Sequence, residues 1–339
     1  MGVTVAEKAA ALSLPTALAV LLLLAPPVLA GPPCATCHAS EARQWRRSLH
    51  ARSMEDPLYL AMRGWARADL GGQAPKMCSN CHSVALAGGA GRTPSVNCVS
   101  CHRGAGVSPG PAGWRVEPGP QVAASRPTAS SPHPVVVNPR LASGELCLVC
   151  HGELHNPRGV PICTTGQEAG PPGSRPGCTT CHMPFASHVF PGSSARLLSQ
   201  AASLAIELNG RQAVVTVVNL GTGHALPTGS ILRRVRLEVF FQDKTGQELG
   251  RRSETFARTL EDAGGHAPVP PWRAAAVHSD TRLQRGERRV FRYPIPAGAR
   301  RINARLVYSR APAKLLERLG LANAPDLQPA EMTRTTRGL

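Results

Sequence analysis

The pentapeptide C-x-x-C-H occurs five times in this 339-residue chain, and no other feature constrains the fold as strongly. The copies begin at Cys34, Cys78, Cys98, Cys147 and Cys178. They use ten of the eleven cysteines, whereas a shuffled chain with the same Cys and His frequencies would contain only about 0.01 such motifs. The repeated pattern is therefore not accidental, and the fold must be built around it.

Each copy has the residues that attach a c-type haem. The two thiols form thioether bonds to the vinyl groups of the porphyrin, and the histidine that follows binds the iron from one side. Two cysteines three positions apart share one helical turn, which suits this attachment. We predict five covalent haems on Cys34, Cys37, Cys78, Cys81, Cys98, Cys101, Cys147, Cys150, Cys178 and Cys181. The predicted proximal iron ligands are His38, His82, His102, His151 and His182.

Other uses of cysteine fit this pattern less well. Structural zinc pairs C-x-x-C units without requiring a histidine after each second cysteine, and disulfide pairing would leave one of the eleven thiols over. The cysteine outside the motifs is Cys163, in PICTTGQEAG. A buried structural thiol is the favoured interpretation of Cys163, with iron ligation or an intermolecular bond as alternatives.

The first thirty residues have the pattern of a secretory signal peptide. A basic residue precedes an apolar run from Leu12 to Leu29, and the small-residue sequence VLA ends at Ala30. We predict a signal peptide over 1–30 and cleavage after Ala30. Prolines interrupt the run and no basic cluster follows it, so an uncleaved membrane anchor is the weaker alternative. The prediction is a periplasmic or extracellular-facing protein without a stable transmembrane span.

The remaining sequence would make a poor core from polypeptide alone. Aromatic residues are only 4% of the chain, whereas 33 glycines and 32 prolines exceed the usual share. This composition indicates that the haems themselves fill much of the interior. The net charge of +17 is spread along Arg-rich segments, which leaves solvated surface charge and electrostatic steering as alternatives. Nucleic acid is not an expected partner of an exported protein.

All five motifs fall in the first part of the mature chain. We predict a pentahaem cytochrome domain over 31–195, in which short helices and coil wrap the haems. One helix is predicted over 41–54, and a second follows the N-cap Asp56 and stops at Gly71. The Gly/Pro/Ser-rich stretch 103–134 is predicted to be irregular.

Beyond residue 195 the pattern becomes that of β-strands. SLAIEL, AVVTVVNL, LRRVRLEVFF, RRVFRYPI and RINARLVYS alternate or are β-branched, with turns such as NGRQ and DKTG between strands. We predict an antiparallel β-sandwich of about seven strands over 196–312, then a C-terminal helix and tail over 313–339. The predicted fold class is mixed, with a haem-cored, mainly α/coil cytochrome domain followed by the sandwich. Because the sandwich has no cysteine, a structural cap is its simplest role.

The motif region resembles a known family. CATCHASEARQWRRSLHARSM resembles the start of the tetrahaem cytochrome c-554 family of nitrifying bacteria and its multihaem relatives, in which W-x-x-S-x-H-A follows the first motif. The matching residues here include Trp45, Ser48 and His50. CTTCHMPFASHVFPG is similar to a segment of related cytochromes that has a histidine at the position of His188. In the family such extra histidines are distal haem ligands, and the resemblance implies this role for His50 and His188.

The chain departs from that family in having five motifs rather than four and in adding a β-domain. GHALPTG in this domain resembles a G-H-x-x-P-T-G signature in C-terminal β-domains of other multihaem cytochromes, and it contains His224. Seven histidines remain after the proximal five, and five irons need at most five partners. The predicted distal ligands are His50, His133, His155, His188 and His224. His266 and His278 are predicted to lie on the surface, and Met54, Met62, Met77 and Met183 are predicted not to ligate iron.

The sixth iron ligand would decide function. Two imidazoles give a low-spin iron without an open site, whereas a five-coordinate iron can bind a small nitrogen or oxygen compound. Five candidate distal histidines for five irons favour an exported electron-transfer protein rather than an enzyme. Such a protein would serve redox partners such as quinol-oxidising proteins or other cytochromes. One alternative is an oxidoreductase that reduces such a compound at one five-coordinate haem. Another is a cytochrome that docks through its β-domain to a membrane or surface complex, or polymerises.

Overall fold

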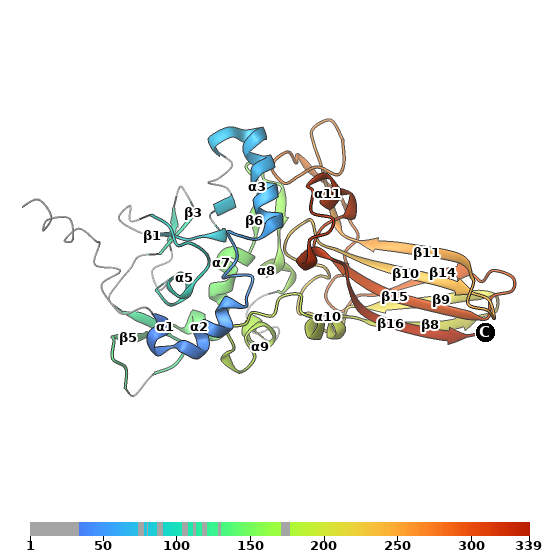
Figure 1. Ribbon diagram of the computed structural model, residues 1–339, viewed down its shortest axis with the longest axis horizontal. Helices are drawn as coiled ribbons and strands as arrows, with labels where there is room; N and C mark the ends of the chain where they lie inside the picture. Colours follow the sequence, from blue (N-terminus) through green and yellow to red (C-terminus); the bar gives the residue numbers. More distant parts are fainter. Residues whose placement is uncertain are drawn as a thin grey trace, which may run out of the picture.

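The computed structural model describes residues 34–73, 78–79, 81–86, 91–103, 108–110, 113–116, 121–127, 130–170 and 177–339. The predicted signal peptide and Met77 lie outside these ranges. The motif-bearing half forms one end of an elongated molecule, and β-sheets form the other end, where the C-terminus lies (Figure 1). Within the described ranges, no helix is both long enough and apolar enough to cross a membrane.

The first helices carry the first motif and the segment after it. They are α1 (Cys34–Cys37), α2 (Ala39–Arg46) and α3 (Pro57–Leu70). Helix α3 starts where the sequence predicts, because Asp56 Oδ1 accepts a hydrogen bond from the backbone N–H of Tyr59 at 3.1 Å. Helix α2 ends earlier than predicted, since Ser48 Oγ accepts the backbone N–H of Ala51 at 3.2 Å in place of a helical carbonyl. His50 therefore lies in a turn.

Short elements joined by turns make up the rest of the motif-bearing half. Its helices are η2 (Gly71–Gln73), α5 (Cys98–His102), α6 (Pro139–Ser143), η5 (Glu145–Cys147), α7 (Leu148–His151), α8 (Thr165–Glu168), α9 (Cys178–His182) and η6 (Pro184–Ala186). Its strands are β1 (Ala85–Leu86), β2 (Ser108–Gly110), β3 (Gly113–Val116), β4 (Val122–Ala124), β5 (Val135–Val137), β6 (Leu154–His155) and β7 (Pro161–Cys163). Because β2, β3 and β4 fall within 103–134, that stretch is less irregular than predicted.

Antiparallel sheets build the C-terminal half. The four-stranded sheet has the order β11-β10-β15-β16, the three-stranded sheet has the order β14-β9-β8, and β12 pairs with β13. The strands are β8 (Ser203–Asn209), β9 (Gln212–Val218), β10 (Arg234–Gln242), β11 (Glu248–Phe256), β12 (Arg258–Glu261), β13 (Ala276–Asp280), β14 (Arg288–Pro294), β15 (Arg301–Ser309) and β16 (Ala330–Gly338). The predicted mixed fold, a helical cytochrome region followed by antiparallel sheets, is confirmed.

One apolar core joins the two larger sheets. Leu237 and Phe241 of β10 are no more than 1% exposed, and they share a cluster with Val215 of β9 and Leu306 of β15. These positions follow the period of two that the sequence shows. Every buried member of this cluster lies at Leu198 or beyond. The main apolar core therefore belongs to the C-terminal half, as expected if the motif-bearing half is filled by haem.

The ends of the β-half differ partly from the prediction. Helix α10 (Ala195–Ala201) precedes β8, and α11 (Ala313–Arg318) lies within the segment predicted to be helical. The short helix η7 (Pro325–Leu327) follows, and the predicted tail contains the edge strand β16, paired along β15. In β16 only Met332 is buried, so its sequence has too little apolar alternation to predict a strand.

Helix α3 connects the two halves beside α11 (Figure 1). Leu58 of α3 packs in one apolar cluster with Leu316 of α11 and Leu327. Further along α3, Asp69 Oδ2 accepts hydrogen bonds from Trp272 Nε1 at 2.6 Å and from Arg273 Nε at 2.7 Å. These contacts hold the loop with Trp272 and Arg273 of the β-half against α3 of the motif-bearing half.

Candidate haem sites

The motif residues lie on short helices. The first motif starts α1, the third forms α5, the fourth ends with α7 and the fifth forms α9. A capping box fixes the start of α5, in which Asn97 Oδ1 accepts the Ser100 N–H at 3.3 Å and Ser100 Oγ accepts the Asn97 N–H at 3.1 Å. In these four motifs a short helical segment thus presents the two cysteines with the histidine directly after them, as covalent attachment requires.

Four motif histidines face a second histidine from elsewhere in the chain. The ring centres are 6.3 Å apart for His38 and His133, 6.3 Å for His50 and His151, 6.1 Å for His102 and His188, and 6.5 Å for His182 and His224. A metal–imidazole bond is about 2 Å long and the ring centre lies roughly 1 Å behind the nitrogen, so two axial imidazoles on one iron have centres about 6 Å apart. The spacing and the donor atoms therefore fit a haem iron between each pair.

Backbone carbonyl groups orient several of these rings. The Nδ1 atom lies 2.9 Å from the Ala123 carbonyl oxygen in His102 and 2.8 Å from the Ala225 carbonyl oxygen in His224. Because a carbonyl oxygen can only accept, Nδ1 carries the proton in this arrangement, and Nε2 is left as the iron ligand. His82 has the same contact, from Nδ1 to the Ser53 carbonyl oxygen at 2.7 Å.

Burial favours the neutral form of four of these imidazoles. It lowers the pKa of His151 to about 4, with a further contribution from the nearby His50 ring. Burial is also the main cause of the lowered pKa of His50, His182 and His188. Neutral imidazole is the form that binds a metal, so burial favours the ligating form of these four histidines.

His82 of the second motif is not paired with another histidine ring, although all twelve histidines lie in the described part of the chain. Its ring stacks on Tyr59, with centres 4.1 Å apart, which is too close for an iron between them. The Tyr59 hydroxyl in turn donates to Met54 Sδ at 3.3 Å. The second motif therefore differs from the other four in its surroundings.

The other histidines contact carboxylates instead. His155 Nε2 lies 3.2 Å from Glu153 Oε1, and the structure does not bring His155 beside a motif histidine among the residues that it describes. His266 contacts Asp262, and His278 contacts Glu261, both on the exposed surface. Met62 packs against the apolar clusters beside α3, as predicted. Cys163 is buried, with Sγ 3.5 Å from Thr165 Oγ1.

A network of hydrogen bonds holds the loop that carries His224. Asn219, which is fully buried, donates from Nδ2 to the carbonyl oxygens of His224 at 2.9 Å and Leu283 at 3.1 Å. Thr222 Oγ1 donates to the same His224 carbonyl at 2.6 Å. Leu226 and Leu283 exchange two backbone hydrogen bonds of 2.8 and 3.0 Å. No sequence motif points to this role of Asn219, because it depends on a contact with the distant loop that contains Leu283 as well as on the nearby His224.

Two glycines near His224 are required by the backbone. A Cβ atom on Gly221 would lie 1.7 Å from the Gln200 carbonyl oxygen, so no side chain fits there. Gly229, the last residue of GHALPTG, has a φ of 82°. A Cβ atom on Gly229 would also lie 3.0 Å from Arg233 Nη1. Glycine is therefore favoured at the end of GHALPTG both by the positive φ of Gly229 and by the guanidinium group of Arg233 beside it.

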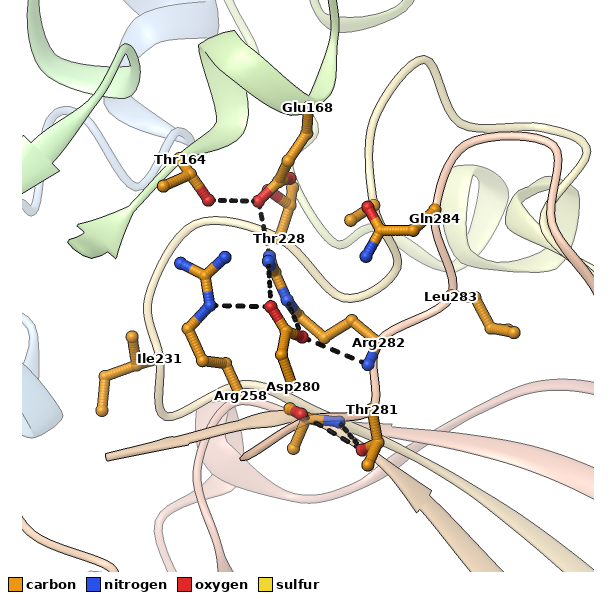
Figure 2. Close-up of polar contacts among 12 residues, drawn as sticks. Thr164, Glu168, Thr228, Ile231, Arg258, Asp280, Thr281, Arg282, Leu283 and Gln284 are labelled. Atoms are coloured by element: carbon orange, nitrogen blue, oxygen red, sulfur yellow. Dashed lines mark hydrogen bonds and ion pairs between the residues drawn. The ribbon is translucent and has the colours of Figure 1, made fainter. Parts of the chain in front are cut away.

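A buried ionic network joins the GHALPTG loop to the motif-bearing half (Figure 2). Glu168 of α8 accepts hydrogen bonds from Thr164 Oγ1 at 2.6 Å, from Thr228 Oγ1, and from Arg282 Nη1 at 2.5 Å. The side chains of Glu168 and Arg282 are only 6% and 7% exposed. Asp280 completes the network by binding Arg282 Nε at 2.8 Å and Arg258 Nε at 2.9 Å.

The network explains why Glu168 stays charged. Burial by itself raises the pKa of this carboxyl, but hydrogen bonds from Thr164, Thr228 and Arg282 outweigh burial and lower the pKa below its usual value. These residues come from separate segments, and of the segments only the one with Thr228 carries a recognised motif, GHALPTG. Sequence reasoning therefore could not identify the network.

Cysteines of different motifs are neighbours. The thiol pairs in hydrogen-bonding contact are Cys34 with Cys98, Cys81 with Cys150, and Cys147 with Cys178. Cys101 also lies close enough to Cys147 and Cys150 for their charges to interact. The first motif thus neighbours the third, and the fourth neighbours the second, the third and the fifth. The spatial order of the motifs differs from their order in the sequence.

Comparison with known proteins supports the same assignment. The family model described as cytochrome c554 and c-prime matches residues 33–103, which contain the first three motifs. A penta-heme cytochrome c552 from Thermochromatium tepidum has a similar structure, with a TM-score of 0.76 and 25% sequence identity over 90% of this chain and 97% of that chain. The likeness therefore extends across both halves, and the predicted resemblance to multihaem c-type cytochromes is confirmed.

The other comparisons add nothing to this assignment. No curated protein matches the chain. An endonuclease/exonuclease/phosphatase structure from Beutenbergia cavernae aligns with 41% of this chain and 24% of that chain, at 16% identity and a TM-score of only 0.18. That score does not indicate a shared fold.

Proposed function

We propose that this chain, a multihaem c-type cytochrome by its motifs and its similarity to a penta-heme cytochrome, holds five covalent haems and passes electrons along them. The observation that carries the proposal is the set of four histidine pairs with ring centres 6.1 to 6.5 Å apart. When bound, haem supplies reversible one-electron exchange at its iron. At each of the four pairs the chain would supply two imidazoles to that iron, which would leave no position for a substrate there.

Contacts between motifs favour transfer within the protein. The fourth motif touches the second and the fifth through Cys150 and Cys147, and it lies beside Cys101 of the third. Attachment points this close place their haems in one continuous group, so an electron that enters at one haem has a neighbour to move to. The rigid sheets of the C-terminal half, with His224 at their edge, fix one end of that group.

Haem count and spin state test this proposal. We expect five haems per chain from the absorbance of the pyridine haemochrome, and low-spin bis-imidazole signals from four of them in the electron paramagnetic resonance spectrum of the oxidised protein. Both values follow from the motifs and the histidine pairs. A spectrum with fewer than four bis-imidazole haems in fully loaded protein would contradict the assignment of the pairs.

Export and partners belong to the same proposal. The predicted leader over 1–30 and the covalent attachment of haem support a periplasmic or extracellular-facing protein. Its partners would be other redox proteins, such as quinol-oxidising proteins or cytochromes. Sequencing the N-terminus of the protein from a haem-attaching host tests the export step, for which we expect mature protein that begins at Gly31.

The second motif supports a second candidate function. His82 faces no second histidine in the described structure, and Tyr59 occupies one face of its ring. An iron bound by His82 without a second protein ligand could take a small nitrogen or oxygen compound, with neighbouring haems as the source of electrons. This site would make the chain an oxidoreductase as well as an electron carrier.

Carbon monoxide tests the open site directly. We expect the fully reduced protein to bind one CO per chain, at a haem whose signal in the oxidised protein is high-spin. We also expect turnover of nitrite or hydroxylamine with a reduced viologen dye as donor. Absence of a CO adduct would show that the haem on His82 has a sixth ligand from the protein, which leaves the electron-transfer proposal intact and removes the enzymatic one.

A further inference from the structure

Arg233 lies in the loop between GHALPTG and β10, and its charge has no acidic partner of its own among the described residues. Its Nη1 donates to the Thr228 carbonyl oxygen at 3.0 Å, which folds the guanidinium back over Gly229. Gly229 leaves room for this position, since a Cβ atom there would lie 3.0 Å from Nη1. The side chain is partly buried. A partly desolvated guanidinium usually binds a carboxylate or a phosphate.

The surroundings of Arg233 carry excess positive charge. A small pocket beside it is lined by Thr228, Gly229, Ser230, Arg258 and Arg282 as well as by Arg233 itself. Arg258 and Arg282 are paired with the carboxylates of Asp280 and Glu168 (Figure 2). Arg233 adds a third positive charge beside these two carboxylates, so the pocket is suited to an anion.

Contacts place this pocket next to the fourth motif. Thr228 Oγ1 lies 2.8 Å from Thr165 Oγ1 of α8. The next residue of that helix, Gly166, donates its backbone N–H to the Gly152 carbonyl oxygen at 3.2 Å, and Gly152 directly follows His151. These contacts bring the pocket that Arg233 lines next to the fourth motif, whose cysteines are Cys147 and Cys150.

We propose that Arg233 binds a propionate carboxylate of the haem attached at the fourth motif. The carboxylate would balance the positive charge of the pocket, and it needs a counter-charge because it is removed from water. The β-half thereby contacts two haems through one loop, with His224 at the iron of the fifth motif and Arg233 at the edge of the haem of the fourth. This inference rests on the proposed haem attachment and adds a positioning residue to it.

The sign of the effect on potential follows from charge. Reduction adds one negative charge at the iron, and a nearby positive charge favours the reduced form. Removing Arg233 also leaves the propionate charge unpaired, which favours the oxidised form. Both effects lower the midpoint potential of that haem.

Spectroelectrochemical titration of Arg233→Gln, Arg233→Lys and Arg234→Gln in the fully loaded protein tests the proposal. We expect Arg233→Gln to lower the potential of one haem and Arg233→Lys to retain the wild-type value, because lysine keeps the charge. Arg234 is the matched control, since its Nη1 donates only to the carbonyl oxygens of Ile231 and Leu232, at 3.3 and 3.0 Å. A potential lowered equally by the lysine and glutamine variants would show a structural effect and would overturn the proposal, as would five unchanged potentials in Arg233→Gln.

The assignment to the fourth motif has its own test. In an Arg233→Gln, His224→Ala double variant, the haem of the fifth motif has lost its distal ligand and is recognisable as high-spin. We expect the lowered potential to stay on a low-spin haem. A lowered potential on the high-spin haem would move the contact to the fifth motif and overturn the assignment. Wild-type protein without low-spin bis-imidazole haems would instead refute the proposed function, so the two failures are distinguishable.

Discussion

At the scale of single residues, His224 shows how a β-domain can take part in haem chemistry. Its imidazole stands opposite His182 with ring centres 6.5 Å apart, and its carbonyl oxygen is held by Asn219 and Thr222. The hydrogen bonds fix the backbone on one side of the residue, and the backbone carbonyl of Ala225 orients the ring. The residue is therefore placed as a ligand would need to be, by groups that themselves never touch the iron.

Replacing His224 with alanine tests this role. We expect His224→Ala to convert one haem from low-spin to a high-spin form that binds CO, because the iron on His182 loses its second imidazole. Absorbance and electron paramagnetic resonance spectra measure the change, and the number of covalent haems should stay the same. His278→Ala is the control, since His278 is paired with Glu261 on the surface. Unchanged low-spin signals in His224→Ala would refute the ligand role.

Glu168 links the two halves through Thr228 and Arg282. Glu168→Gln leaves the buried Arg282 with one carboxylate partner instead of two, and breaking a buried ion pair costs about 3 kcal/mol. We expect a loss of this size in the free energy of unfolding measured with urea at pH 7. Glu248→Gln, which alters an exposed pair with Arg251, should change stability by less than about 0.5 kcal/mol. Equal effects of the two variants would contradict the buried network.

The same carboxyl gives a pH dependence with a definite sign. The pKa of Glu168 is lowered in the folded protein, so its contribution to stability is complete above the unfolded-state pKa of about 4.3 and is lost as the pH falls through the folded-state value. We expect the stability difference between wild type and Glu168→Gln to shrink below about pH 4. Urea unfolding at pH 3 and pH 7 measures it. A difference that grows on acidification would have the wrong sign.

At the scale of elements, α3 of the cytochrome half packs directly on the β-half. Trp272 is 8% exposed, clusters with Ala66 of α3, and meets Trp65 edge-to-face with ring centres 5.4 Å apart. Asp69 at the same end of α3 holds Trp272 Nε1 and Arg273. The apolar contacts and the hydrogen bonds at this end of α3 therefore hold the same loop, which contains Trp272 and Arg273.

Truncating Trp272 tests the contribution of this contact. We expect Trp272→Ala to cost about 3 kcal/mol of unfolding free energy, because a large buried ring is lost and Asp69 loses a donor. Limited proteolysis should cut the protein between its halves faster than wild type. Leu249→Ala, at a residue that is 36% exposed, is the control. Wild-type stability and proteolysis in Trp272→Ala would show that the halves are held together elsewhere.

At the scale of the whole molecule, charge is the dominant surface property. The chain carries a net charge of +17, and although haem propionates reduce this value, exposed arginines such as Arg252 and Arg337 remain on the sheets. Such a surface attracts anionic partners over a distance that salt shortens. The positive charge is thus suited to the capture of acidic redox proteins.

Reduction kinetics test this steering. We expect the bimolecular rate of reduction by a small anionic donor to fall by about tenfold between roughly 0.01 M and 1 M salt, because screening removes the attraction. Stopped-flow absorbance measures the rate, and a neutral donor of similar potential is the control. A rate that does not depend on salt for the anionic donor would show that the charge is dispersed too evenly to steer.

The sequence by itself determined the features that depend on neighbouring residues. The spacing within each C-x-x-C-H motif predicts attachment and a proximal ligand, and alternation identifies the inward faces of strands such as β10. Tertiary structure decided which distant residues meet. It brought His133, His50, His188 and His224 to four motif histidines, left His155 with Glu153, and assembled Glu168, Thr228 and Arg282 from separate segments. The physical reason is that spacing along a helix or strand is set by local backbone geometry, whereas a contact between remote residues exists only once loops and helices have packed.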